Sequence, residues 1–471
     1  MQLPDAQALV LGTVQVVLSV GVTIDALLRK RNVAAATAWI GLAWLSPLLG
    51  SLLYLVLGIN RVTRRAARLR RRRRQRGRPD AAGQGSATAP EPMAPLDVAV
   101  TRITGRQALE GNAVELLEHG DAAYPRMLAA IDAARHSIAM ASYIFRDDQA
   151  GRPMIEALAR AHRRGVEVRV LIDGIGGGYF TGAAWHALQS RGVPAERFLH
   201  SPLPWRTPLL NLRLHSKLLV IDGAHGFTGG LNISAECLLA SNPQGPVRDT
   251  HFAVAGPVAA QMMAAFARDW HFTADEQLRG PLWFPDIATA GSDVARVVTS
   301  GPDQELERIR TVILSAVGEA ERSIHVCTPY FLPDETMGTA LELAALRGVA
   351  VDITLPARSD HRLVDWGSRA GLAPLLAAGC IIRSGEPPFD HSKLMTVDGL
   401  WCLIGSANWD SRSLRLNFET NTEIRSEALA AQIDAIITAR RSNTITTNDL
   451  KRRPLLTKLR DAAARLLLPY L

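Results

Sequence analysis

The sequence predicts an α/β protein of two duplicated halves, each with a mixed, mostly parallel sheet and flanking helices, preceded by an N-terminal membrane hairpin. Two observations carry this prediction. Two long apolar stretches open the 471-residue chain, and a helix–strand pattern with a short histidine motif occurs twice in the rest. We expect a membrane hairpin at 1–60, an arm and linker at 61–95, and the two halves at 96–285 and 286–471.

The apolar stretches at 8–24 and 33–59 contain no charged residue. Residues 26–28 extend the first stretch beyond Asp25, so each is long enough for a helix of about 20 residues, which crosses a hydrocarbon core of about 30 Å. The opening MQLPDAQ lacks the basic start and small-residue cleavage site of a signal peptide. Two transmembrane helices are therefore predicted, with a buried soluble hairpin as the alternative.

An arginine-rich arm follows the second apolar stretch. Residues 61–78 contain eleven arginines and no acidic residue, and the tendency of positive charge to stay inside places them in the cytoplasm. Two full crossings would then put the loop at 29–32, with three positive charges, outside the cell, against the same tendency. A partly inserted hairpin remains open. We expect a multi-pass membrane protein whose catalytic region, after the arm, lies in the cytosol.

The formal net charge of +8 belongs to this arm, because the remainder sums to 8 − 11 = −3. That distribution argues against a nucleic-acid partner, for which basic residues would spread over a globular face. The arm contacts anionic headgroups or serves as a plain stop-transfer flank. Residues 79–95 are rich in Pro, Ala, Gly and Ser and predict a flexible linker. The four cysteines form no C-x-x-C pair, which favours reduced thiols over disulfides or a metal site.

The rest of the chain repeats a β/α pattern. In each copy an apolar strand is followed by a helix and a second strand. The segments are 132–145, 157–165 and 166–173 in the first copy, and 318–332, 340–348 and 349–355 in the second. The copies lie about 180 residues apart, too far for a solenoid, so two packed α/β halves are expected.

Each half also contains one motif with matched spacing. The first consists of His215, Lys217, Asp222, Gly229 and Asn232, and the second of His391, Lys393, Asp398, Gly405 and Asn408. The offsets from the histidine are 2, 7, 14 and 17 residues in both. Since each residue type makes up about one residue in twenty, four matches from a given histidine have odds on the order of 10⁻⁵. The repeated motif therefore indicates a functional site.

The spacing predicts that the polar groups of each motif converge. Residues two apart on a strand share a face, so His215 and Lys217 should point the same way. The Asp–Gly pairs at Asp222 and Asp398 are typical of tight turns that return the chain as a second strand, bringing each asparagine toward its histidine. Because such turns favour aspartate for backbone reasons, a structural role for both aspartates competes with a catalytic one.

This set of side chains suits attack on a phosphodiester. Two lysines can neutralise phosphate oxygens, and two asparagine amides can donate hydrogen bonds as charge builds. One neutral imidazole can attack phosphorus, while the other, as imidazolium, protonates the leaving alkoxide and later deprotonates the acceptor. We expect no cofactor and no metal, because the sequence has no H-E-x-x-H motif and no clustered carboxylates.

These residues resemble the phospholipase D superfamily, whose mark is H-x-K-x4-D occurring twice. The likeness extends to the bacterial cardiolipin synthases through the apolar stretch ATAWIGLAWLSPLLGSLLYLVLG and segments beyond the motifs. These segments are YIFRDD (143–148), VLIDGIG (170–176), FTGGLNIS (227–234), RDTHFAVAGP (248–257), SRSLRLNFETN (411–421) and the C-terminal RLLLPYL. The resemblance covers almost the whole chain except the linker. It implies two phospholipase D-like halves with one active site between them.

By this resemblance His215 is the nucleophile that forms a phosphatidyl-histidine, and His391 is the general acid and base. An acidic residue after each motif, Asp249 in the first half and Glu419 in the second, is expected to orient the imidazole of that motif. The remaining catalytic candidates are Lys217, Lys393, Asp222 and Asp398, with Asn232 and Asn408 in support.

Two serines depart from the pattern of the resembling family. Ser216 stands where a basic residue is common, and Ser392 stands where alanine is common. Both are expected on the strand face opposite the histidine, so they predict altered packing or lipid contact and leave the chemistry intact.

The resemblance implies a phosphatidyltransferase that makes cardiolipin and glycerol from two phosphatidylglycerol molecules. A phospholipase D that passes the phosphatidyl group to water or another alcohol is the alternative, followed by a nuclease of the same superfamily or an inactive membrane scaffold. Residues 454–471 are amphipathic, with leucines at helical spacing opposite basic residues. They predict a membrane-interface helix or a helix packed on the domain. Oligomeric state is not predicted.

Overall fold

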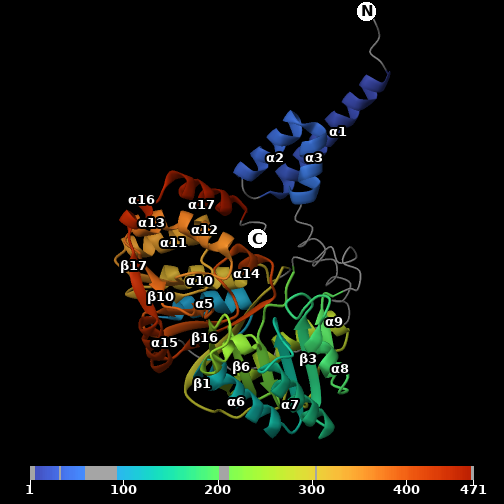
Figure 1. Ribbon diagram of the computed structural model, residues 1–471, viewed down its shortest axis with the longest axis vertical. Coiled ribbons are helices and arrows are strands. Elements are labelled where there is room, and N and C mark those ends of the chain that lie inside the picture. The colour runs from blue at the N-terminus through green and yellow to red at the C-terminus, as the bar shows by residue number, and fades with distance from the viewer. Residues whose placement is uncertain (1–5, 31–32, 59–92, 201–211, 303–304, 468–471) are drawn as a thin grey trace, which may run out of the picture. The chain divides into compact units, whose positions relative to one another are not determined.

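The computed structural model describes residues 6–30, 33–58, 93–200, 212–302 and 305–467 (Figure 1). They form two compact units, one within residues 1–69 and one within 70–471. The arginine-rich arm, most of the linker and the last four residues of the chain lie outside the described residues.

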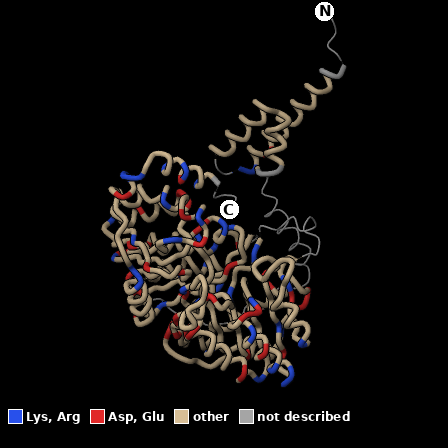
Figure 2. The backbone as a smooth tube through the Cα atoms, in the orientation of Figure 1, with Lys and Arg blue, Asp and Glu red and all other residues tan. Residues whose placement is uncertain are grey.

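The first unit opens with one long apolar helix, α1 (Ala6–Arg29). Its 24 residues extend about 36 Å at 1.5 Å per residue, more than the hydrocarbon core of about 30 Å. The part from Leu9 to Arg29 is long and apolar enough to cross a membrane. Its large apolar side chains, such as Leu9 and Val17, are mostly exposed. Figure 2 shows this unit almost without charged residues, whereas acidic and basic residues are interspersed over the second unit.

The second apolar stretch is not one continuous helix, so a second full crossing stays a prediction. Helix α2 (Val33–Leu45) ends at Ser46, which has a non-helical backbone (φ −141°, ψ 79°), and α3 (Pro47–Leu53) begins at a proline. Proline lacks the N–H that a continuing helix needs and disfavours a helical residue before it. A π-helical turn, η1 (Tyr54–Gly58), follows. The 13 residues of α2 extend only about 20 Å.

Hydrogen bonds show that this stretch turns back along α1. The Ser19 hydroxyl donates to the carbonyl of Ala43, 2.6 Å away, near the end of α2. The Lys30 ammonium donates to the carbonyl of Gly58 at 2.5 Å, after the chain has returned through α3. Residues 33–58 therefore begin and finish at the same end of α1.

The second unit contains one mixed sheet of fifteen strands. From one edge to the other the order is β17-β12-β11-β10-β14-β15-β16-β9-β1-β8-β6-β5-β2-β3-β4. The strands earlier in the chain are β1 (Leu109–Glu118), β2 (Ser137–Ser142), β3 (Glu167–Asp173), β4 (Ala195–Phe198), β5 (Leu218–Ile221), β6 (His225–Gly229) and β8 (Thr250–Ala255). The later ones are β9 (Asp293–Ser300), β10 (Ser323–Cys327), β11 (Ala350–Pro356), β12 (Ile381–Gly385), β14 (Leu394–Val397), β15 (Trp401–Gly405), β16 (Glu419–Arg425) and β17 (Arg441–Ile445).

The strand order repeats itself about the junction of β1 and β9. Moving outward, β1-β8-β6-β5-β2-β3-β4 matches β9-β16-β15-β14-β10-β11-β12, with β17 added at one edge. This order confirms the predicted duplication. In the main sheet the parallel pairs are confined to β2-β3-β4 and β10-β11-β12, and the other described pairs are antiparallel. The sheet is thus mixed but not mostly parallel, because the histidine motifs lie on hairpins.

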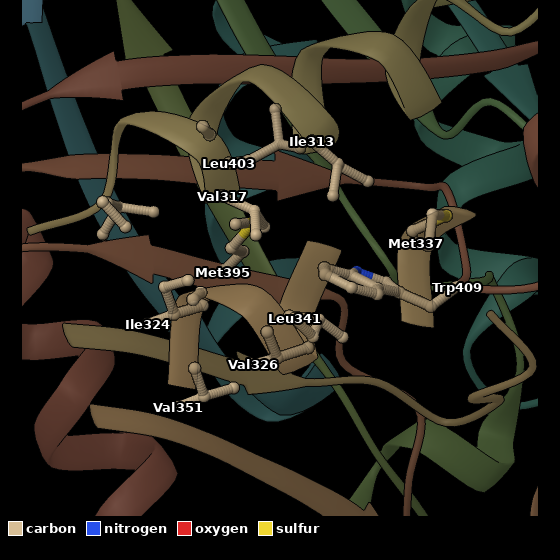
Figure 3. Close-up of a cluster of buried hydrophobic side chains, with 14 of the residues drawn as sticks. Ile313, Val317, Ile324, Val326, Met337, Leu341, Val351, Met395, Leu403 and Trp409 are labelled. Carbon is tan, nitrogen blue, oxygen red and sulfur yellow. The ribbon is translucent and has the colours of Figure 1, made fainter. Parts of the chain in front are cut away.

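Helices cover the sheet in both halves. The earlier ones are α5 (Ala94–Thr104), α6 (His119–Ala133), α7 (Gly151–Arg163), α8 (Ala183–Gln189) and α9 (Val258–Ala274). The later ones are α10 (Arg308–Glu319), α11 (Glu335–Leu346), α12 (Arg362–Ala370), α13 (Leu372–Ala377), α14 (Ser411–Arg415), α15 (Glu427–Ala439), α16 (Thr447–Lys451) and α17 (Leu455–Leu467). Figure 3 shows the core of the second half, where α10 and α11 pack on the strands through Ile313, Val317 and Leu341. Helix α5 packs into this same core through Leu96 and Val100, although the predicted boundary at residue 96 assigned most of it to the first half.

Each histidine motif leads into a hairpin closed by the predicted Asp–Gly turn. Asp222 and Gly223 have φ of 49° and 64°, and Asp398 and Gly399 have φ of 55° and 65°. Two consecutive positive φ values identify the two-residue turn that matches the twist of a hairpin. These turns connect β5 to β6 and β14 to β15.

Candidate functional site

The two motifs meet at one cavity of about 620 Å³. His215 and Asn232 of the first half line it together with His391 and Asn408 of the second. Both imidazoles are buried, with 6% and 8% of each residue exposed. The structure therefore brings together the two histidines that the sequence had placed in separate halves.

The backbone of each histidine is held by the opposite half. The N–H of His215 donates to the carbonyl of Phe418 at 2.9 Å, and the N–H of His391 donates to the carbonyl of Arg248 at 2.7 Å. A small parallel sheet of β7 (Val247–Arg248) and β13 (Phe389–Asp390) adds to the second connection. Each histidine thus has its position set by both halves, so the site exists only where they pack together.

The carboxylates are also exchanged between the halves, which corrects the expected pairing. Nδ1 of His215 lies 3.0 Å from Oε2 of Glu419, and Nδ1 of His391 lies 2.8 Å from Oδ2 of Asp249. An ionised carboxylate only accepts hydrogen bonds, so we assign the imidazole proton to Nδ1 in both rings. The lone pair of each ring is then on Nε2. The sequence led us to expect that each acid orients the histidine of its own motif. Nearness along the chain cannot reveal an exchange between the halves.

The two lysines lie beside the imidazoles as predicted from their spacing. Nζ of Lys217 donates to the carbonyl of His215 at 2.8 Å, and Nζ of Lys393 donates to the carbonyl of His391 and lies 3.0 Å from its Nε2. Burial and the neighbouring ammonium of Lys393 lower the pKa of Lys217 to about 7. Burial also lowers the pKa of Lys393 to about 8, partly opposed by Asp249 and Glu419. Two such cations beside the histidines of one cavity favour an anionic ligand there.

The same surroundings lower the pKa of both imidazoles. Burial, followed by the charges of Lys217 and Lys393, lowers the pKa of His215 well below its usual value. Burial and Lys393 also lower the pKa of His391, but the hydrogen bond and charge of Asp249 oppose that shift.

The two acceptor carboxylates differ in charge state. Burial raises the pKa of Glu419 to about 7 despite the nearby Lys217. Burial also pushes the pKa of Asp249 upward, but Lys393 and His391 outweigh it and the net pKa lies below the usual value. Asp249 therefore stays ionised beside His391, whereas Glu419 beside His215 is close to half protonated at neutral pH.

Asp222 and Asp398 are not part of the site, which corrects their assignment as catalytic candidates. The Asp222 carboxylate accepts the backbone N–H groups of His136 and Ser137 at 2.7 and 2.9 Å. Asp398 does the same for Arg322 and Ser323 at 2.7 and 2.8 Å. Each aspartate stands one strand length beyond its histidine and fixes the start of β2 or β10. These contacts support the structural role that the Asp–Gly turns predict.

The two asparagines reach the cavity as expected. Oδ1 of Asn232 accepts a hydrogen bond from the backbone N–H of Ile144 at 3.4 Å. The amide NH₂ of Asn232 therefore points away from this N–H. Asn408 is only 4% exposed, and its Oδ1 has no hydrogen-bond partner among the described residues. A buried polar atom of this kind, at the wall of a cavity, is typical of a position where a ligand completes the hydrogen bonding.

The two serines inside the motifs contribute to packing between the halves. The hydroxyl of Ser216 lies 2.9 Å from that of Thr420, and the hydroxyl of Ser392 lies 3.0 Å from that of Thr250. Both serines are fully buried. Of the two expectations for these departures, the structure supports packing and excludes lipid contact.

Two tyrosines line the cavity that the sequence analysis did not single out. The ring of Tyr143 meets the imidazole of His215 edge-on at 4.9 Å, and the Tyr330 hydroxyl donates to Asp360 at 2.7 Å. Arg213 and Arg412 also line the cavity. The tyrosines stand in corresponding stretches of the repeat, SYIF and PYFL. That correspondence was the available signal.

Among the described residues no group of three or more His, Cys, Asp or Glu side chains could hold a metal ion. The four cysteines are buried as free thiols.

Comparison with known proteins gives a consistent result. Residues 127–270 and 313–441 match the family described as cardiolipin synthase, PLD-like domain. The chain is 32% identical to a cardiolipin synthase of Geobacillus kaustophilus (strain HTA426), over 98% of this chain and 94% of that protein. It is 31% identical to the major cardiolipin synthase of Bacillus subtilis (strain 168), over 94% of this chain and 95% of that protein.

A solved structure shares the fold. The crystal structure of phosphatidylserine synthase from Haemophilus influenzae Rd KW20 aligns with a TM-score of 0.62 and 15% identity. The alignment covers 80% of this chain and all of that one.

Proposed function

The chain belongs to the cardiolipin synthase family of phospholipase D-like proteins, and we propose that it joins two phosphatidylglycerol molecules into cardiolipin and releases glycerol. One observation carries this proposal. Two buried histidines from separate halves line one cavity, and each is held at Nδ1 by a carboxylate, which leaves the ring lone pair on Nε2. Two histidines with distinct environments suit a reaction in two steps.

In the first step Nε2 of His215 attacks the phosphorus atom of one phosphatidylglycerol. An N–P bond forms, and the bond from phosphorus to the headgroup glycerol oxygen breaks. His391, as imidazolium, gives its proton to that oxygen, and glycerol leaves. The low pKa of His215 supports its role as nucleophile, and the ionised Asp249 supports the ability of His391 to hold a proton.

In the second step a hydroxyl of another phosphatidylglycerol attacks the phosphatidyl-histidine. His391 accepts the hydroxyl proton, a new O–P bond forms, and the N–P bond breaks to restore neutral His215 and release cardiolipin. Lys217 and Lys393 offset the charge of the phosphoryl oxygens, and the amide of Asn232 donates a hydrogen bond as that charge grows.

Product analysis tests this function. Purified protein in phosphatidylglycerol micelles is expected to form cardiolipin and release an equal amount of glycerol without added nucleotide or metal. If phosphatidic acid is the only lipid product, water is the acceptor, and the protein is a phospholipase D that hydrolyses the same substrate.

For the membrane region we propose a single crossing by α1 in the bacterial cytoplasmic membrane, with residues 33–58 as a re-entrant hairpin. The return of Gly58 to Lys30 supports this topology. It places the basic residues that follow α1 and the arginine-rich arm on the same side, which agrees with the positive-inside rule, whereas two full crossings would not. The catalytic unit then lies in the cytosol with the N-terminus outside.

Reporter fusions distinguish the two topologies. An alkaline phosphatase fused to the N-terminus is expected to be active if α1 is the single crossing. A fluorescent protein at the C-terminus should report a cytosolic position in either case. An inactive N-terminal phosphatase would support two full crossings.

A further inference from the structure

Helix α17 is oriented opposite to an ordinary surface helix. A helix on a globular domain normally turns its apolar stripe toward the core. In α17 the large apolar side chains point outward instead. Leu455, Leu456, Leu459 and Leu466 are between 56% and 80% exposed.

The inward face of α17 is made of small and charged residues. Ala464 and Asp461 are 3% and 1% exposed, and α17 packs along α12 (Figure 1). The Asp461 carboxylate forms ion pairs with Arg460 at 2.8 Å and Arg453 at 2.6 Å. The Arg460 guanidinium also lies over the ring of Trp366 of α12 at 4.3 Å. These buried contacts fix the rotation of α17, so the outward leucines are not the result of a loosely attached helix.

The charges around this leucine face are almost all positive. Residues 451–467 contain six basic side chains and one acidic one, and that acid is the buried Asp461. Lys458 and Arg465 flank the leucines on one side of the helix. An apolar stripe with basic flanks matches a bilayer interface that contains anionic phospholipids.

Helix α12 connects this face to the catalytic cavity. Arg362 and Leu363, at its first turn, line the cavity, and Trp366, one turn further, contacts α17. Leu363 is 38% exposed. A surface that receives the leucines of α17 would therefore lie beside the residues through which a lipid reaches the histidines.

We propose that α17 docks the catalytic unit on the surface of a bilayer containing anionic phospholipid. Leu455, Leu456, Leu459 and Leu466 insert between the lipids, with Lys458 and Arg465 at the phosphate level. This contact is separate from the anchor supplied by α1. The role of this contact rests on the proposed function, because the contact would present the cavity to a lipid substrate. The contact itself can form without turnover.

The test measures the depth of α17 in the full chain, because α1 would hold any variant on vesicles. A Leu456→Cys variant is labelled with an environment-sensitive fluorophore and placed in phosphatidylglycerol-containing vesicles with lipids brominated at known depths. The native cysteines do not compete, since all four are buried. An Arg163→Cys variant on α7, at the far end of the same unit, is the matched control (Figure 1).

The label at position 456 is expected to lie about 5–10 Å below the phosphate level, as for other interfacial helices. The label at position 163 should be quenched only by a water-soluble quencher. Equal accessibility to water at both positions overturns the proposal. The proposal is also overturned if, in detergent without lipid, the label at position 456 becomes less accessible to water as the protein concentration rises. A second copy of the chain would then cover the leucines.

Activity gives a second, independent readout. A Leu456→Gln/Leu459→Gln variant is expected to lose turnover on vesicles but to keep the wild-type rate on short-chain phosphatidylglycerol dispersed in detergent. Equal rates on vesicles would contradict the proposal. A protein that makes no cardiolipin at all can still show the predicted depth, so failure of the proposed function is distinguishable from failure of the docking surface.

Discussion

The two halves of the catalytic unit share one fold but build different surroundings for their histidines. His391 is held by the short Asp249, and Gly230 leaves room for that carboxylate, because a Cβ at this position would stand 2.2 Å from Oδ1 of Asp249. His215 is held by the longer Glu419, and Ser406, at the position matching Gly230, donates a hydrogen bond to that carboxylate at 2.5 Å.

The difference shows how a duplicated fold can divide one reaction between two identical side chains. Asp249 remains ionised and favours a proton on His391, while burial and the two lysines hold the pKa of His215 well below its usual value. The exchange of carboxylates between the halves adds a constraint, because neither histidine is oriented until the halves have packed. The repeated fold therefore brings the two histidines together, and a few residues that differ between the halves make their surroundings unlike.

The largest expected effect separates the two histidines. His215→Ala should lower turnover by a factor on the order of 10⁴–10⁶, as for loss of a nucleophile. His391→Ala should lose about 10²–10⁴ with phosphatidylglycerol, the usual worth of a general acid. With phosphatidyl-p-nitrophenol, whose leaving group needs no proton, only His391→Ala should recover release of p-nitrophenol. Equal recovery of both variants would contradict the assignment of roles.

The carboxylates test the exchange between the halves. Asp249→Asn should weaken the proton transfer of His391 and be rescued by the p-nitrophenol substrate. Glu419→Gln should impair His215 and not be rescued. We expect losses of about 100-fold in each case, because the imidazole loses its orientation. The opposite pattern of rescue would show that each acid serves the histidine of its own half.

Substitutions of the residues that contact the two carboxylates are expected to lower activity by a smaller factor. Gly230→Ala inserts a methyl group against Asp249 and should reproduce the Asp249→Asn phenotype in part. Ser406→Ala removes one hydrogen bond from Glu419 without a clash, and such a bond to a charged group is worth about 1.5–3 kcal/mol. Steady-state kinetics of both variants, with circular dichroism as the folding control, should show the larger loss for Gly230→Ala. A larger loss for Ser406→Ala would overturn this ranking.

The pH profile distinguishes the two lysines. The pKa of His391, the proposed acid, lies below its usual value, so kcat/KM should fall first as that imidazolium loses its proton. The pKa of Lys217 is about 7 and that of Lys393 about 8, so a further fall, at the alkaline limit, is expected as pH rises through 7 and Lys217 loses its proton. Lys217→Arg keeps its charge and should move this alkaline limit up toward 8. Lys393→Arg should leave the limit near 7. Because the pKa of His215 is well below its usual value, activity should persist below pH 6.5.

The smallest effect on chemistry is expected at the turns. Asp222→Asn and Asp398→Asn weaken the hydrogen bonds to the backbone N–H groups at the start of β2 and β10. Each should lower the free energy of unfolding by about 1–3 kcal/mol. Chemical denaturation measures this loss. The kcat of the folded protein should stay near the wild-type value, and a large fall would return the aspartates to the reaction.

The site was largely predictable because its signal is repeated. Two histidines, two lysines and two asparagines at matched offsets identified the cavity before its geometry was known. The exchange of Asp249 and Glu419 was not predictable, since it depends on how the halves pack. The roles of Asp222 and Asp398 were ambiguous in the sequence, because turn geometry and chemistry favour the same residue type there.

Apolar stretches were harder to interpret than the motif. Length and composition predicted a second crossing at 33–59, but the break at Ser46–Pro47 depends on backbone conformation. The sheet was expected to be mostly parallel because the repeat was recognised from its β/α part alone. The hairpins that carry the histidines supply antiparallel strands. The amphipathic pattern of α17 was visible in the sequence, but the direction in which its leucines point was not.

The most direct test of the account identifies the residue that carries the phosphatidyl group during turnover. Protein mixed briefly with radiolabelled phosphatidylglycerol, quenched under alkaline conditions and digested should yield one labelled peptide, with the phosphoryl group on His215. The Glu419→Gln variant should carry less label, and His391→Ala should still carry it with the p-nitrophenol substrate. A label on His391, or cardiolipin formation without any labelled histidine, would contradict the proposed division of roles.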